Sequence, residues 1–233
     1  MLRKVSSGFT LLELLAVIAV LAILAALLVP VVNSVRSAGM SVECVSNLRT
    51  IYHATLAFTE DYNGLLPPAL GNSTGTSQIH PEFNVNQYWF ETAYLGRYVL
   101  GQYDRPRDGS GKLTPEEMEP YKCPARLVDG PDANWTGATS QVTYVMRNWR
   151  LTQKDYRLAT RSEKSKRLLL TEGRHGTLAP PAAKTGEFGV PDPTRRLRRY
   201  HNGGLNILFL DGHIERFSGP DEDILPMLEA DPD

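Results

Sequence analysis

The feature that most constrains this chain is an uninterrupted apolar run near its N-terminus. Every residue from Leu14 to Val32 is apolar, and a short segment containing Arg3 and Lys4 precedes the run. At about 1.5 Å per helical residue, the run is about long enough to cross the hydrocarbon core of a bilayer. Positive charges stay on the cytoplasmic side. The sequence therefore predicts a single-pass inner (cytoplasmic) membrane protein whose C-terminal domain is extracytoplasmic.

Three interpretations compete for this segment: a cleaved secretory signal, a plain transmembrane anchor, and a short leader followed by a retained helix. The best signal-peptidase site after the run places Arg36 where a small residue is needed, which weakens the first interpretation. Glu13 lies inside the longer apolar segment that begins at Phe9, where a carboxylate costs on the order of 3 kcal/mol and calls for a partner. Neither of the first two interpretations supplies that partner.

The segment from Gly8 to Glu13, GFTLLE, resembles the cleavage and methylation motif of type IV pilins and type II secretion pseudopilins. The resemblance implies that prepilin peptidase cuts between Gly8 and Phe9 and that the new Phe9 amine is methylated. It also implies that Glu13 pairs in the membrane with the Phe9 amine of its own or a neighbouring subunit. The implied partners are prepilin peptidase, the membrane and other pilin-like subunits, in a filament of one or several kinds of subunit.

The whole chain predicts an α+β fold, similar to pilins, with a long N-terminal helix packed on an antiparallel sheet. Apolar side chains recur at steps of three and four beyond the membrane segment, so the helix should continue to about Tyr62. The expected parts are a leader at 1–8, a transmembrane helix at 9–32, an amphipathic helix at 33–62, and an extracytoplasmic globular domain at 63–233 with an insert at about 71–120. A short helix is expected at 87–100 and strands at 142–145, 167–171 and 205–210.

The chain has two cysteines, Cys44 on the predicted helix and Cys123 in a loop before a proline. Their spacing matches neither a zinc site nor a C-x-x-C redox motif. An oxidising compartment would allow them to pair, with a chain-entropy benefit of about 4 kcal/mol. Two separately buried thiols are the alternative. In similar prepilin-like proteins a C-x-x-N-L-[RK] segment and a later Cys-Pro recur, which favours a shared architecture without deciding the bond.

A second local pattern concerns calcium. Asp108, Ser110 and Glu117 resemble the later ligands of an EF-hand loop, but Pro106 stands where the first aspartate would be. The alternative is a capped helical turn with Thr114 as N-cap and Glu117 at N3, which we favour. Calcium bound by these three residues stays as the other expectation, and no further cofactor is predicted.

The C-terminal part predicts a β-hairpin within residues 201–217. Asp211 and Gly212 separate two apolar runs, and this dipeptide favours a type I′ turn with positive φ at both central positions. His201, nine residues and Asp211-Gly212 together resemble the H-X9-DG signature of prepilin-like proteins often labelled type II secretion protein G-like. We expect His201 to hold the hairpin by reaching nearby backbone or the Asp211 carboxylate. Alternation predicts that Ile207 and Phe209 face the long helix.

These features predict a non-enzymatic structural subunit of a type IV pilus-like or type II secretion pseudopilus-like filament. One alternative is a processed, membrane-anchored binding module that never polymerises. Another is an anchored hydrolase using His201 and Asp211, but the chain has neither a G-x-S-x-G nor an H-E-x-x-H motif. With a net charge of −1, the chain has no overall attraction for nucleic acid. We predict neither a nucleic-acid partner nor a small-molecule substrate.

Overall fold

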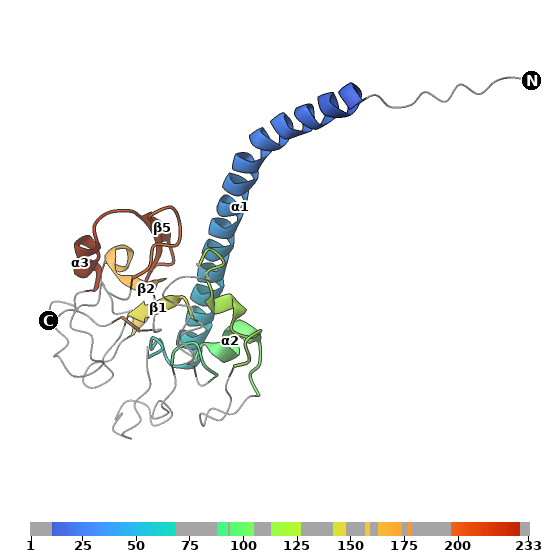
Figure 1. Ribbon diagram of the computed structural model, residues 1–233. Coiled ribbons are helices and arrows are strands. Elements are labelled where there is room, and N and C mark those ends of the chain that lie inside the picture. Colours follow the sequence, from blue (N-terminus) through green and yellow to red (C-terminus); the bar gives the residue numbers. More distant parts are fainter. Residues whose placement is uncertain are drawn as a thin grey trace, which may run out of the picture. The chain divides into compact units, whose positions relative to one another are not determined.

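The computed structural model describes residues 11–68, 88–92, 94–104, 113–126, 142–147, 157–158, 163–173, 177–178 and 197–228. The helices are α1 (Leu11–Asp61), α2 (Gly96–Leu100) and α3 (Leu225–Leu228), with 3-10 turns η2 (Glu119–Tyr121), η5 (Lys164–Lys166) and η7 (Asp221–Ile224). The strands are β1 (Tyr144–Arg147), β2 (Leu168–Glu172), β3 (Thr177–Leu178), β4 (Leu205–Phe209) and β5 (Ile214–Phe217). The chain divides into two compact units, residues 1–40 and 41–233, and α1 contributes to both (Figure 1).

Helix α1 ends at Asp61, next to the end predicted at Tyr62. Two left-handed residues follow, Asn63 with φ 53° and Gly64 with φ 85°, and this conformation cannot continue a right-handed helix. Within the second unit, α1 buries one face, as the predicted spacing of three and four requires. The buried residues of α1 are Cys44, Leu48, Ile51, Ala54, Thr55, Phe58 and Thr59.

The sheet has the strand order β3-β1-β2-β4-β5. The pairs β1–β2, β2–β4 and β4–β5 are antiparallel, so the antiparallel sheet is confirmed, with the two-residue β3 added parallel to β1. Strand β1 begins two residues later than predicted, and β2 begins one residue later. Together with the long helix, this sheet gives the α+β, pilin-like fold that the sequence predicts.

Both faces of the central strands are buried, because every residue of β2 and β4 is buried. The face toward α1 carries Leu208 and Leu210, with Ile214 packed beside them. Ile207 and Phe209 belong to a second cluster, which includes Ile224 of η7. The prediction that Ile207 and Phe209 face the helix is therefore wrong. Alternation could not assign the faces because the run LNILFL is apolar at nearly every position.

The helix predicted at 87–100 is shorter, since only Gly96–Leu100 is α-helical and the chain turns at 89–92. The turn is tight: a β-carbon on Gly96 would lie 2.6 Å from the carbonyl oxygen of Phe90. Trp89 and Phe90 are fully buried in the cluster that packs on α1. Figure 1 shows α2 beside the C-terminal part of α1, where Tyr98 donates a 2.6 Å hydrogen bond to Asp61.

Candidate functional site

The first unit presents an apolar helical surface. In α1 the side chains of the apolar run are exposed, for example Leu21 at 58% and Val32 at 60%. This is the one helix among the described residues that is long and apolar enough to cross a membrane. Glu13 lies in the first turn of α1, and its side chain is exposed. Gly8 and Phe9, the predicted cleavage and methylation residues, lie outside the described residues.

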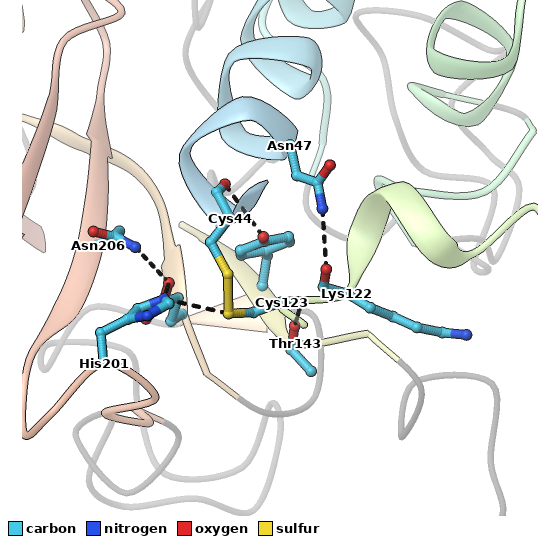
Figure 2. The surroundings of a disulfide bond; sticks show 9 residues. Cys44, Asn47, Lys122, Cys123, Thr143, His201 and Asn206 are labelled. Atoms are coloured by element: carbon cyan, nitrogen blue, oxygen red, sulfur yellow. Dashed lines mark hydrogen bonds and ion pairs between the residues drawn. A yellow bond between two sulfur atoms is a disulfide. The ribbon is translucent and has the colours of Figure 1, made fainter. Parts of the chain in front are cut away.

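In the second unit the structure joins Cys44 to Cys123 through a disulfide bond (Figure 2). The bond links α1 to the segment after η2 across 79 residues of sequence, and its Cα atoms are 5.1 Å apart. Neighbouring hydrogen bonds hold the same junction, since Asn47 donates to the Lys122 carbonyl at 3.1 Å and the Cys123 amide donates to the Thr143 hydroxyl. Of the two alternatives left open by the sequence, the structure has the bonded pair, which links α1 to the rest of the second unit.

His201 lies against this disulfide and pairs with Glu172, the last residue of β2. Its Nε2 atom is 2.9 Å from Glu172 Oε1 and 3.3 Å from Cys123 Sγ. Asn206 donates a further 2.8 Å hydrogen bond to the same carboxylate oxygen. All three polar side chains are buried, with Glu172 at 0% exposure. Figure 2 shows His201 and Asn206 converging beside the disulfide.

The His201 ring has a different partner from the two predicted, which were nearby backbone and the Asp211 carboxylate. The Asp211 carboxylate accepts a 2.6 Å hydrogen bond from His213 Nδ1, whereas the His201 ring contacts Glu172. Asp211 and His213 lie at the surface. Partial burial alone would raise the pKa of Asp211, but its hydrogen bonds with His213 leave that pKa below its usual value. His201 and Asp211, the histidine and aspartate of the H-X9-DG pattern, therefore pair with different residues.

A type I′ turn positions His201. Asn202 and Gly203 are both left-handed, with φ of 46° and 78°, and the flanking His201 and Gly204 exchange two backbone hydrogen bonds of 3.1 and 2.9 Å. This is the geometry that an Asn-Gly dipeptide favours. Sequence reasoning missed the turn, although the Asn-Gly pair was its signal. It also missed Glu172 and Asn206, whose signal is a polar residue in or beside an apolar strand.

The turn between β4 and β5 has another geometry from the one predicted. Only Gly212 is left-handed there, with φ 90°, and Asp211 is not. The Gly212 amide donates to the Phe209 carbonyl at 3.0 Å, and the Phe209 amide donates to the His213 carbonyl at 3.0 Å, which closes a three-residue loop. The prediction of a type I′ turn at Asp211-Gly212 is wrong because Leu210 is buried in the core and belongs to the loop.

The proposed calcium residues lie only partly in the described chain. Asp108 and Ser110 are outside it. The Thr114 amide donates to Glu117 Oε2 at 2.8 Å and the Glu117 amide donates to the Thr114 hydroxyl at 3.3 Å, which is the reciprocal capping pair of the alternative prediction. Glu117 Oε1 also accepts a 3.3 Å hydrogen bond from Gln102. The capped turn is confirmed, and calcium binding stays a prediction.

The prokaryotic N-terminal methylation motif matches residues 3–29. The match covers residues 3–8 of the leader, the predicted cleavage position, Glu13 and most of the apolar run. Together with the long apolar helix on an α+β unit, it supports a prepilin-like protein with a single-pass membrane anchor. No curated protein and no solved structure matches the chain.

Proposed function

We propose that the chain is a structural subunit of a type IV pilus-like or type II secretion pseudopilus-like filament, and that prepilin peptidase processes it. The single observation that carries the proposal is the methylation motif at residues 3–29, which contains Gly8, Phe9 and Glu13. Cleavage after Gly8 would leave a positive Phe9 amine at the start of the apolar segment. Glu13 is the acidic residue in the first turn of α1, and its carboxylate can form an ion pair with that amine.

The exposed apolar surface of α1 supports assembly as well as anchoring. Exposed large apolar side chains run from Leu11 to Val35, far more than a soluble surface carries. Lipid can cover this surface before assembly, and the apolar helices of other subunits can cover it in a filament core. In either apolar setting a carboxylate needs a cationic partner, so pairing between Glu13 and Phe9 of a neighbour would fix the register between subunits.

The proposal also covers the orientation of the chain in the membrane and the kind of prepilin-like protein to which it belongs. Arg3 and Lys4 favour a cytoplasmic N-terminus, which places the domain after the membrane segment outside the cytoplasm. The disulfide fits this placement because such bonds persist in oxidising compartments. The spacing of His201 and Asp211-Gly212 supports a place for the chain among the H-X9-DG prepilin-like proteins. We propose no catalytic role for His201, which is buried and paired with Glu172.

The test is to shear cells that express the chain and to look for it in purified filaments by immunogold labelling. Glu13→Leu should keep the chain in the membrane and remove it from the sheared filaments. Glu43→Leu is the matched control, since Glu43 is an exposed carboxylate on the same helix beyond the apolar run. This control variant should assemble normally.

The alternative functions give different results in the same strains. A processed binding module that never polymerises would be absent from sheared material, and Glu13→Leu would leave its binding unchanged. Equal amounts of the wild-type chain and of Glu13→Leu in purified filaments would contradict the role of Glu13 in assembly. Hydrolytic turnover that His201→Ala abolishes in a folded chain would support the anchored hydrolase instead.

A further inference from the structure

Four side chains that can bind a metal meet in the core of the second unit. Cys44 comes from α1, Cys123 follows η2, Glu172 ends β2 and His201 begins the type I′ turn. One ligand atom from each lies within 4.8 Å of the other three, and all four residues are buried. The four residues come from segments far apart in sequence, so no short spacing motif could predict the cluster.

The donors form a set typical of zinc. Two thiolates, one imidazole and one carboxylate suit tetrahedral Zn²⁺, whose bonds of about 2.0–2.3 Å separate neighbouring ligand atoms by roughly 3.3–3.8 Å. His201 Nε2 is already 3.3 Å from Cys123 Sγ and 2.9 Å from Glu172 Oε1. The two sulfur atoms, 2.08 Å apart, are too close only because they are bonded to each other. As separate thiolates they would move apart.

The environment of Glu172 is an independent observation that points to a cation. Its carboxylate is fully buried, and Oε2 has no hydrogen-bond partner in the part of the chain that the structure describes. In the disulfide form, Oε1 accepts hydrogen bonds from His201 Nε2 and from the Asn206 amide, and His201 Nε2 would turn from Oε1 to a bound metal. An unpartnered carboxylate oxygen in a buried site is costly, and a metal ion would supply its missing partner. Asn206 would then orient the ligand from outside the site.

We propose that the dithiol form of this domain binds one Zn²⁺ through Cys44, Cys123, Glu172 and His201. Cysteines enter a newly made chain as thiols, so this form precedes the disulfide. Binding of Zn²⁺ displaces the two thiol protons. A disulfide of a thiol–disulfide exchange partner then takes two electrons from the thiolates, which forms the Cys44–Cys123 bond and releases Zn²⁺. The partner's sulfur atoms take up two protons from water and become two thiols. The ion would hold α1 against the rest of the second unit until the disulfide forms, whether or not the chain polymerises.

The test uses the full chain in detergent, freed of metal and reduced with a phosphine that does not bind zinc. Co²⁺ is the probe, because tetrahedral Co²⁺ with thiolate ligands gives visible d–d bands and a near-ultraviolet charge-transfer band. The reduced chain should bind one Co²⁺ with both signals, and Zn²⁺ should displace it. The oxidised chain should give neither signal, since its sulfur atoms are bonded to each other.

Variants separate the proposed site from a bare pair of thiols. His201→Gln and Glu172→Gln should each weaken Co²⁺ binding at least tenfold in the reduced chain. His213→Gln is the matched control, because His213 is an exposed histidine that also pairs with a carboxylate. It should leave the affinity unchanged. Unchanged affinity in both His201→Gln and Glu172→Gln would overturn the proposal.

Two further measurements keep the proposal open to refutation if a variant fails to fold. X-ray absorption of zinc in the reduced wild-type chain should show two sulfur and two nitrogen or oxygen ligands, and any other set would overturn it. Near-ultraviolet circular dichroism should show the reduced chain folded with zinc. A reduced chain that stays unfolded when zinc is added, or that folds without binding it, would also overturn it.

Discussion

The ring of Tyr52 fills the space where a β-carbon on Gly212 would lie. Such a carbon would be 2.3 Å from Tyr52 Cε1, well inside van der Waals contact. The Tyr52 hydroxyl reaches the Leu210 carbonyl at 3.4 Å, so the helix contacts the hairpin turn through both the ring and its oxygen. Burial and the nearby Asp211 carboxylate raise the pKa of Tyr52 above its usual value. Glycine at 212 is what allows the turn to approach α1.

Gly212→Ala should destabilise the domain by more than about 2 kcal/mol, because it combines left-handed strain with a clash against Tyr52. Gly101→Ala is the matched control, since Gly101 is also left-handed, with φ 66°, but has open space around it. It should cost about 1 kcal/mol. Thermal and denaturant melts of the detergent-solubilised chain measure both values. In a Tyr52→Ala background, the cost of Gly212→Ala should fall to that of the control, and an undiminished cost would contradict the contact.

The sequence predicted features that one strong local signal determines. The long helix follows from its apolar run and spacing, and the capped turn follows from Thr114 and Glu117 at the required separation. It could not predict which face of β4 meets α1, because both faces are apolar. It could not predict the partner of His201 either, since Glu172 is 29 residues away in sequence. Such long-range polar pairs depend on strand register, which short motifs do not encode.

Processing gives a second prediction. The mature chain should begin at Phe9 with a methylated amine, because the methylation motif at residues 3–29 includes Gly8-Phe9. Intact-mass measurement of membrane fractions checks the cleavage and the added methyl group. Gly8→Leu should leave the full-length precursor. Gly39→Leu, which changes a glycine of α1 with open space beside it, should be processed normally. A mature chain that begins at Met1 or beyond Val32 would contradict the interpretation.

The disulfide gives a third prediction. Replacing both cysteines with serine, Cys44→Ser with Cys123→Ser, should lower the free energy of unfolding by roughly 2–4 kcal/mol, because the bond closes a long loop. Non-reducing peptide mapping of chain purified without reductant should find the two cysteines linked. Free thiols on both would show that the bond is not a native feature. Equal stability of the wild-type and serine variants would show that the bond does not contribute to the fold.

The buried pair gives a fourth prediction. His201→Ala should destabilise the oxidised domain by about 3 kcal/mol, because it leaves the Glu172 carboxylate buried without its imidazole partner. His213→Ala breaks an exposed pair and should change stability by less than about 1 kcal/mol. The same melts compare the two variants. Equal, small effects would contradict a stabilising role for His201 and would favour a role in binding or catalysis.

Tyr121 gives a fifth prediction, which concerns alkaline pH. The residue is fully buried, and its hydroxyl has no hydrogen-bond partner among the residues that the structure describes. Burial raises the pKa of Tyr121 well above 10.0 in the folded chain. The folded state therefore holds this proton more tightly than the unfolded chain, whose tyrosines titrate near pH ~10. The resulting stability is fully present below that pH and is lost as the pH rises above it.

Tyr121→Phe should accordingly be as stable as the wild type at pH 7, or more stable by up to about 1 kcal/mol, because it removes a buried hydroxyl without a described partner. Between pH 9 and 11 the wild type should lose roughly 1 kcal/mol more than this variant. Tyr103→Phe is the control, since Tyr103 is 58% exposed, and its pH dependence should follow the wild type. Denaturant melts across this pH range measure all three chains. If Tyr121→Phe loses as much stability as the wild type, the proton on Tyr121 does not contribute to the alkaline transition; if it is markedly less stable at pH 7, the hydroxyl has a stabilising partner in the folded chain.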